Sequence, residues 1–250
     1  MRVENSYIPV SGVGETTERR IWEAGATDWA SFDPDLVGPT IGERIETFIR
    51  QAEPRLESGD VAFFAERFPT AEQWRLCENF RDDILYLDIE TTGLDRYRNS
   101  VTTVSLYRDG RVRTLVQGRD LSADRLRREF DDAKLLATFN GSQFDVPFLE
   151  ASFDVDVDLP HLDLRFLAQR LDLTGGLKSI EQTIGIGRDR PDISGREAVR
   201  LWHEYERGNP AALETLIEYN REDTTNLKTL LDVVTDRLHE RVAPTPTFPE

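Results

Sequence analysis

Ile84-Leu85-Tyr86-Leu87-Asp88-Ile89-Glu90 is a short apolar run with acidic residues at its last and third-last positions. A run of this kind is typical of a buried central β-strand. Residues two apart on a strand share a face, so Asp88 and Glu90 project together near its carboxyl end. Adjacent carboxylates in an apolar setting repel each other and lose hydration unless a proton or a cation relieves them. The stretch by itself fits either an ordinary polar strand end or a metal site.

The residues that follow this run predict a sheet. The turn sequence Asp109-Gly110 is a hairpin signal, and it separates two runs of strand-forming residues at 101–107 and 112–117. Residues 134–139 predict a further buried strand. An antiparallel start of three strands, followed by mixed strands and helices, indicates an α/β domain with a mixed sheet.

The rest of the chain predicts helices and loops. We expect a helical N-terminal region at residues 1–80, the α/β domain at residues 81–240, and an irregular tail at residues 241–250, which hold three prolines. Pro54 is expected to limit the helix that contains Ile49. The predicted helices cover residues 16–24, 41–49, 61–67, 144–151, 178–184, 195–206, 211–219 and 224–238.

The charge balance is strongly acidic, with 47 acidic and 31 basic residues and a net charge of −16. The excess is spread along the chain, because residues 1–79 carry 15 acidic and 8 basic residues and residues 80–250 carry 32 and 23. Only three of the basic residues are lysines. This pattern favours a protein adapted to concentrated salt, where screening removes self-repulsion. The alternative is a surface that repels nucleic acid, which counts against a nuclease.

Composition also restricts the chemistry. The single cysteine, Cys77, excludes an intramolecular disulfide and any zinc site built from several cysteines. A bound metal would therefore take oxygen ligands or one of three histidines, which favours Mg²⁺ or Mn²⁺. No run of eighteen apolar residues and no signal pattern is present, so we expect a soluble, cytoplasmic protein with no membrane partner.

Two further acidic motifs lie downstream. Asn140-Gly141-Ser142-Gln143-Phe144-Asp145 follows a predicted strand, and Asp145 falls in the first turn of the next helix. Tyr219 and Asp223 are four residues apart in a helical stretch, so they share one face. Taken singly, Asp145 fits a capping carboxylate, and the second pair fits a half-buried tyrosine beside a solvated acid.

Taken together and in order, the motifs Asp-x-Glu, Asn-x-x-x-Phe-Asp and Tyr-x-x-x-Asp resemble those of the tyrosine-type DEDD 3′–5′ exonucleases. The continuation Thr91-Thr92-Gly93-Leu94 is also similar to the first motif of that family. The resemblance spans about residues 82–235, with no departure at the four acids or the tyrosine. Within it the chain looks closest to the YprB-like branch of the RNase H-like superfamily, which the stretches 161–165, 177–179 and 192–195 fit.

This resemblance implies an RNase H-like mixed five-stranded sheet flanked by helices, and phosphodiester hydrolysis with two Mg²⁺ or Mn²⁺ ions. It implies that Asp88, Glu90 and Asp223 bind one ion, and that Asp88 bridges to a second ion, which Asp145 holds directly or through water. Tyr219 is implied to orient the attacking water, because a phenol with a pKa of about 10 is a poor base at neutral pH. The residues implied to contact substrate are Thr91, Thr92, Gly93, Leu94, Asn140 and Lys178.

Other polar residues in the same region admit two interpretations. His161 and Asp163, two apart, suit either a metal site or a structural role at a helix start, and the structural role is the commoner one. Lys178 and the arginines at 188, 190 and 196 could neutralise phosphates, but a solvated, salt-bridged surface is the simpler account for most of them.

Gly12-Val13-Gly14 precedes a predicted helix and looks like a helix-hairpin-helix element, whose backbone amides receive a phosphate. The alternative is a tight turn in a packing module, since Glu15 and Glu18 stand where basic residues are usual.

The sequence therefore predicts a metal-dependent exonuclease acting on the 3′ end of a nucleic acid, with DNA slightly favoured over RNA because of Gly12–Gly14. Two alternatives remain: a non-catalytic nucleic-acid-binding or scaffolding protein with the same fold, and a structure-specific endonuclease with the same chemistry. Protein partners are not predicted.

Overall fold

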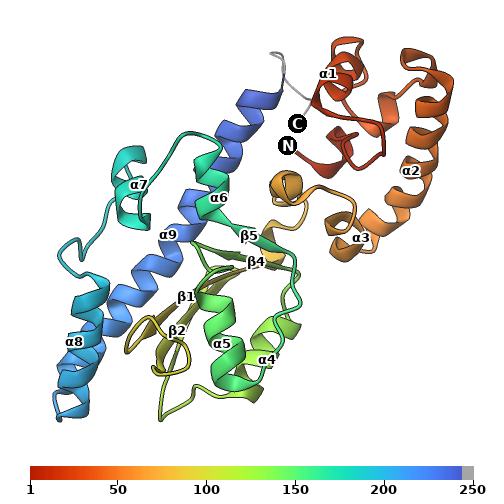
Figure 1. Ribbon diagram of the computed structural model, residues 1–250. Coiled ribbons are helices and arrows are strands. Elements are labelled where there is room, and N and C mark those ends of the chain that lie inside the picture. The colour runs from red at the N-terminus through yellow and green to blue at the C-terminus, as the bar shows by residue number, and fades with distance from the viewer. Residues whose placement is uncertain (244–250) are drawn as a thin grey trace. The chain divides into compact units, whose positions relative to one another are not determined.

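The computed structural model of the chain describes residues 1–243. It has two compact units (Figure 1), one formed by residues 1–81 with residues 233–243 and the other by Asp82–Asp232. Residues 244–250, most of the expected irregular tail, lie outside the described residues. None of the helices in residues 1–243 is long and apolar enough to cross a membrane.

The larger unit is built on a mixed five-stranded sheet in the order β3-β2-β1-β4-β5. β1 pairs antiparallel with β2 and parallel with β4, β2 pairs antiparallel with β3, and β4 pairs parallel with β5. The strands are β1 (Ile84–Thr91), β2 (Val101–Arg108), β3 (Arg111–Val116), β4 (Leu135–Thr138) and β5 (His161–Asp163). The predicted mixed sheet, with its antiparallel start, is confirmed.

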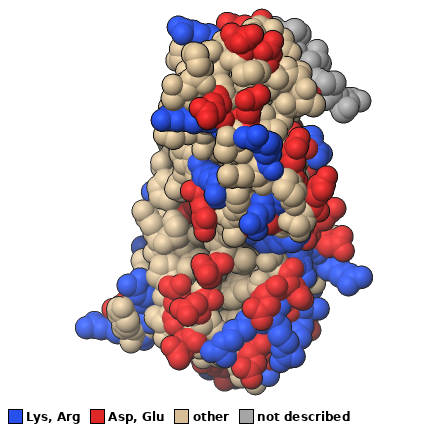
Figure 2. All heavy atoms as spheres, turned by 90° about the vertical axis from the view of Figure 1, so that its right-hand side faces the viewer, with Lys and Arg blue, Asp and Glu red and all other residues tan. Residues whose placement is uncertain are grey.

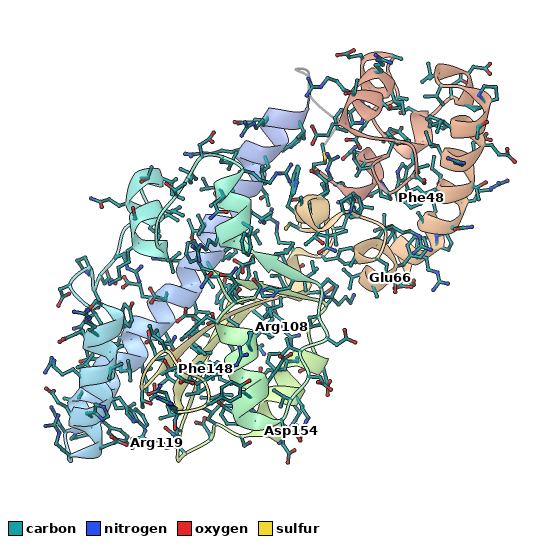
Figure 3. All side chains as sticks on the ribbon, in the orientation of Figure 1. Phe48, Glu66, Arg108, Arg119, Phe148 and Asp154 are labelled. Atoms are coloured by element: carbon teal, nitrogen blue, oxygen red, sulfur yellow. The ribbon has the colours of Figure 1, made fainter. Side chains whose placement is uncertain are left out.

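The central strand β1 separates an apolar face from an acidic one. Leu85, Leu87 and Ile89 alternate along it and join a buried cluster with α4 (Ala123–Asp131) and α5 (Asp145–Phe153). Phe148, labelled in Figure 3, belongs to this cluster and projects from α5. Because side chains alternate across a strand, Asp88 and Glu90 lie on the opposite face.

That opposite face is crossed by α9 (Pro210–Val242), a single helix of 33 residues (Figure 1). The prediction of two helices, at 211–219 and 224–238, was wrong. The four residues between them are polar, but they include neither glycine nor proline, so nothing in the sequence breaks the helix there. Asn220 and Arg221 within this polar stretch hydrogen-bond to the sheet, which keeps the segment helical.

Three shorter helices precede α9 in the same unit: α6 (Leu164–Gln169), α7 (Leu177–Ile184) and α8 (Gly195–Glu206). Trp202 and Leu201 of α8 pack with Leu213 and Leu216 of α9 in a second apolar cluster, which also includes Tyr219. This cluster fixes the rotation of α9 about its axis, and therefore the side chains that it presents to the sheet.

The smaller unit contains α1 (Glu15–Glu23), α2 (Pro39–Glu57) and α3 (Val61–Ala65). α2 runs past Pro54 by three residues, so the expected limit at Pro54 was wrong: a single missing amide near the end of the helix did not stop it. Short 3-10 helices connect these elements, at Val3–Asn5, Trp29–Ser31, Pro34–Leu36, Thr70–Leu76 and Arg81–Asp83.

The surface charges are mixed rather than segregated. Figure 2 shows lysine and arginine side chains interspersed with aspartate and glutamate over one face of the described residues. Elsewhere on the surface, ion pairs form within single helices, such as Arg200 with Glu197 and Lys228 with Asp232. Positive and negative side chains are therefore interspersed on the face shown in Figure 2.

Candidate metal centre

Three carboxylates meet on the acidic face of the sheet. Asp88 and Glu90 of β1 and Asp223 of α9 each offer one oxygen, and these oxygens lie within 4.8 Å of one another. Asp223 is buried, while Asp88 and Glu90 are partly buried. The three residues come from segments more than 130 positions apart, so the fold itself assembles the cluster.

Asp145 lies next to this group of three. It is the first residue of α5 and is 4% exposed, and its Oδ1 accepts a hydrogen bond of 3.1 Å from the backbone amide of Ile89. Ile89 separates Asp88 from Glu90, so this bond ties Asp145 to the strand that carries both acids. All four predicted acids therefore belong to one neighbourhood, with three in the tight group and Asp145 beside it.

The loop before α5 has a backbone that few residues permit. Asn140 has a φ of 65°, in the left-handed region that asparagine tolerates. A Cβ on Gly141 would lie 2.2 Å from Oγ1 of Thr138, so only glycine fits there. The tight turn from β4 into α5 thus depends on these two residues, and it sets the position of Asp145.

The raised pKa values of the acids indicate that a cation would stabilise their charged forms. Burial raises the pKa of Asp88 to about 7, although the hydrogen bond from Asn220 works against the shift. Burial also raises the pKa of Glu90, and repulsion from Asp88 and Asp145 adds to it. The pKa of Asp145 is raised by burial and by Asp88. Near neutral pH the cluster without metal therefore retains protons, which a divalent ion would displace.

Asn220 is a site residue that the sequence prediction missed. Its side chain is fully buried, its Nδ2 donates to Asp88 Oδ2 at 2.6 Å, and its Oδ1 accepts from Thr103 Oγ1 at 2.9 Å. These bonds fix the Asp88 carboxylate from α9 and β2 together. Its position in the sequence could have indicated this role. Asn220 adjoins Tyr219 and stands three residues before Asp223, on a helix face already assigned to the site.

Tyr219 is buried beside the cluster at 6% exposure. Burial raises the pKa of its phenol, and the charges of Glu90 and Asp88 raise it further, so the hydroxyl remains protonated at neutral pH. The ammonium of Lys178, on α7, lies 4.9 Å from the centroid of the tyrosine ring. Tyr219 and Lys178 were both predicted site residues, and the fold brings them together.

Arg188 corrects one interpretation of the sequence. Its side chain is only 6% exposed, and it forms ion pairs with Asp223 and with the fully buried Glu181. The solvated-surface interpretation is therefore wrong for Arg188, because this guanidinium lies inside the acidic cluster. The solvated-surface interpretation fits Arg190, whose side chain is 40% exposed and pairs with Glu218. It also fits Arg196, which is exposed.

The loop after β1 carries the predicted substrate-contacting stretch. A bulge interrupts the pairing between Glu90 and Thr91, and the hydroxyl of Thr91 donates to the carbonyl of Gly93 at 2.8 Å. The Thr92 hydroxyl accepts from the amide of Ser100 at 3.0 Å. The two hydroxyls therefore shape the loop itself, while the side chain of Leu94 stands out at 86% exposure.

His161 and Asp163 have structural contacts in this fold. Asp163 caps α6 through the amide of Arg165, and its Oδ1 also accepts from the amide of Asn140 at 2.7 Å. His161 Nε2 lies 2.8 Å from Thr138 Oγ1. The predicted site residue Asn140 is held by the same network, since its Oδ1 accepts from Arg165 at 2.5 Å. This network supports the turn that places Asp145.

Gly12, Val13 and Gly14 belong to the other unit. Gly12 has a φ of +94°, Val13 is buried, and Gly14 is the N-cap of α1. A three-residue 3-10 helix, Val3–Asn5, stands before this turn in place of a full first helix. A turn followed by a helix is present, and both the helix-hairpin-helix resemblance and its phosphate-contacting role stay predictions.

The donor set fits a hard divalent cation, because the four carboxylates offer only oxygen ligands. A mixed five-stranded sheet with acids on its central strand, crossed by a long helix that supplies another acid, defines an RNase H-like domain. Residues 85–235 match the model of the RNase H superfamily, and the chain belongs to that superfamily.

Several solved structures are similar to this chain. A nuclease in its apo form is 23% identical, with a TM-score of 0.47, over 63% of this chain and 74% of the other. Brucella melitensis NrnC bound to pGG is 21% identical, with a TM-score of 0.48, over 66% and 77%. A family B DNA polymerase from Pyrobaculum calidifontis is 18% identical, with a TM-score of 0.48, over 64% and 25%. No curated protein matches the chain.

Proposed function

We propose that this protein is a metal-dependent nuclease, a tyrosine-type DEDD 3′–5′ exonuclease of the YprB-like branch. The observation that carries the proposal is the meeting of Asp88, Glu90 and Asp223 within 4.8 Å, with Asp145 beside them. Clustered, buried carboxylates with raised pKa values destabilise a fold unless protons or cations neutralise them. Their oxygen donors suit divalent cations.

In this proposal Asp88, Glu90 and Asp223 hold one Mg²⁺ or Mn²⁺ ion, and Asp88 and Asp145 hold a second. When bound, the ions activate water and stabilise the charge that develops on the phosphate. Asn220 keeps the Asp88 carboxylate in one orientation. Tyr219, protonated and buried, orients the attacking water by a hydrogen bond rather than taking its proton.

The substrate in this proposal is the 3′ end of a nucleic acid, with DNA favoured slightly. The loop Thr91–Leu94 supplies contacts to the terminal nucleotide, and the exposed side chain of Leu94 is available for them. Asn140 and Lys178 are the other proposed substrate contacts. Gly12–Gly14, at the start of α1, is proposed to receive a phosphate through its backbone amides.

The test uses the full chain in concentrated salt with Mn²⁺, offered end-labelled and circular DNA and RNA, each single- and double-stranded. Stepwise loss of nucleotides from the 3′ end, abolished by EDTA, is the expected result. Cleavage of circular substrates would replace the exonuclease with the endonuclease alternative. No metal-dependent cleavage of any substrate would refute the nuclease proposal.

One observation favours the non-catalytic alternative, in which the fold serves as a scaffold. Asp223 is ion-paired with Arg188, and a cluster closed by salt bridges needs no metal. The pair neutralises only one of four acids, however, and Glu181 draws on the same guanidinium. Charge balance therefore favours the enzyme.

A further inference from the structure

Arg188 is the one arginine of the larger unit that lies deep in the metal centre. Its side chain is 6% exposed, its Nη1 pairs with Glu181, and its Nη2 pairs with Asp223. Glu181 is fully buried on α7, and its other oxygen accepts from Asn226 Nδ2 of α9 at 3.0 Å. One edge of the guanidinium is therefore anchored to a fixed carboxylate, and the other edge faces the acids of the metal centre.

The edge that faces the metal centre is only partly satisfied within the protein. Nε of Arg188 is buried and has no hydrogen-bond acceptor among residues 1–243, whereas Nη2 has the Asp223 carboxylate, with which it forms an ion pair. The nearest other acid, Glu222, lies 3.7 Å from Nε, a distance at which only charge attraction acts. Buried donors without acceptors are costly, so this edge is suited to an acceptor that comes from outside the chain.

Nε and one terminal nitrogen of an arginine form a planar fork that matches two oxygens of a phosphate. A divalent cation on Asp223 would repel the guanidinium and take over its counter-ion. The fork would then face the metal centre with Glu181 still neutralising its far side. A phosphodiester at the metal centre brings the two oxygen acceptors and the negative charge that the fork then lacks.

We propose, on the basis of the nuclease function proposed above, that Arg188 binds a substrate phosphate at the metal centre and pairs with Asp223 only in the metal-free state. Glu181 is its positioning residue, which holds the guanidinium while the ligand on the other edge changes from a carboxylate to a phosphate. Arg188 therefore weakens metal binding in the free protein and strengthens nucleic-acid binding.

This double role gives opposite effects on two affinities, which a merely structural arginine would not give. The test compares the wild-type chain with Arg188→Gln. Calorimetric titration measures Mn²⁺ affinity without nucleic acid. Fluorescence anisotropy measures the affinity for a labelled single-stranded oligothymidylate, with Ca²⁺ in place of Mg²⁺, over a series of salt concentrations.

In Arg188→Gln we expect Mn²⁺ affinity to rise, while oligonucleotide affinity falls about 10- to 100-fold, as for the loss of a charged hydrogen-bonded pair. The dependence of log affinity on log salt should become shallower by about 0.7, the value for one phosphate contact on a single strand. Arg190→Gln is the matched control, because Arg190 lies two residues away and pairs at the surface with Glu218. It should leave both affinities unchanged.

Loss of Arg188 leaves Glu181 buried without its cation, so Arg188→Gln could unfold the chain. The double variant Glu181→Gln/Arg188→Gln removes that charge and keeps an acceptor for Asn226, and it should show the same two affinity changes in a folded protein. Unchanged oligonucleotide affinity in either folded variant, or an Mn²⁺ affinity that does not rise, would overturn the proposal.

Failure of the nuclease function would look different. It would appear as absence of metal-dependent cleavage by the wild-type chain. Failure of the inference on Arg188 would appear as a wild-type chain that cleaves, with variants whose oligonucleotide and Mn²⁺ affinities equal those of the wild type.

Discussion

The two units of the molecule each bury a cluster of charged side chains, and the clusters differ in how well their charges are matched. In the smaller unit, Glu18 accepts from the amide of Tyr7, the hydroxyl of Ser6 and the guanidinium of Arg75, all within 2.8 Å. Arg75 also pairs with Glu72, at 2.8 Å. Two acids thus share one fully buried arginine and a set of neutral donors.

In the larger unit, the metal centre contains four acids, Asp88, Glu90, Asp145 and Asp223, and the buried Arg188 pairs with only one of them, Asp223, and also with Glu181. The first cluster is nearly balanced by the protein itself and serves to hold the fold together. The second carries more negative charge than the protein neutralises. We infer that excess buried charge marks the site that binds ions, and that a balanced cluster marks structure.

The largest expected effect concerns catalysis. Asp88→Asn should lower the rate of metal-dependent hydrolysis by at least about 10³-fold, because it removes a proposed metal ligand. The same change should raise the melting temperature of the metal-free protein at pH 8, since it removes a charge whose pKa is raised by burial. Asp124→Asn, at an 81% exposed position on α4, is the control and should change neither quantity. A metal-free variant less stable than the wild type would contradict the comparison.

The balanced cluster should respond in the opposite way. Arg75→Met leaves Glu18 and Glu72 buried without their cation, and we expect the free energy of unfolding to fall by about 3 kcal/mol. Denaturant titration of the metal-free chain measures this. Arg55→Met, which breaks an exposed pair with Asp60, should cost less than about 1 kcal/mol. Equal effects of the two changes would show that the Arg75 cluster is not the structural one.

A smaller effect is expected from the residue that holds Asp88. Asn220→Ala should lower Mn²⁺ affinity about 10- to 100-fold, the range for groups that orient a metal ligand. Thr215→Ala is the control on the same helix, because its hydroxyl donates only to the carbonyl of Ala211. Titration calorimetry of both variants measures the difference. Wild-type affinity in Asn220→Ala would mean that Asp88 needs no support.

The smallest effect is a pH dependence with a defined sign. The pKa of Asp88 is about 7 in the fold against an ordinary value of 3.8, so its contribution to stability is present below about pH 4 and is lost as the pH rises through 7. Mg²⁺ replaces the protons, so it should raise the melting temperature more at pH 8 than at pH 6. A larger Mg²⁺ effect at pH 6 would contradict the assignment.

Much of the fold could be predicted from local patterns. The apolar run that ends at Glu90 identified the central strand, and Asp109-Gly110 identified the hairpin. Each of these signals depends only on residues that are close together in the sequence. The continuity of α9 was missed, since its polar middle segment resembles a loop until the sheet that it crosses is known. Helix ends also escaped prediction at Pro54, where packing of α2 outweighs one missing hydrogen bond.

The candidate site divides in the same way. The four acids and Tyr219 could be proposed because the order and spacing of their motifs are properties of the linear chain. The burial of Arg188 could not, since an arginine in a loop gives no sign of the carboxylates that surround it after folding. Asn220 is an intermediate case. Its position beside Tyr219 is visible in the sequence, but its hydrogen bonds to Asp88 and Thr103 form only when α9 packs on β1 and β2.

The most direct test of the account is anomalous diffraction from crystals of the protein grown with saturating Mn²⁺. We expect anomalous peaks between Asp88, Glu90 and Asp223 and beside Asp145, from two ions about 3.5–4 Å apart, with Arg188 separated from Asp223. No anomalous peak at these residues, with Arg188 still paired to Asp223, would contradict it.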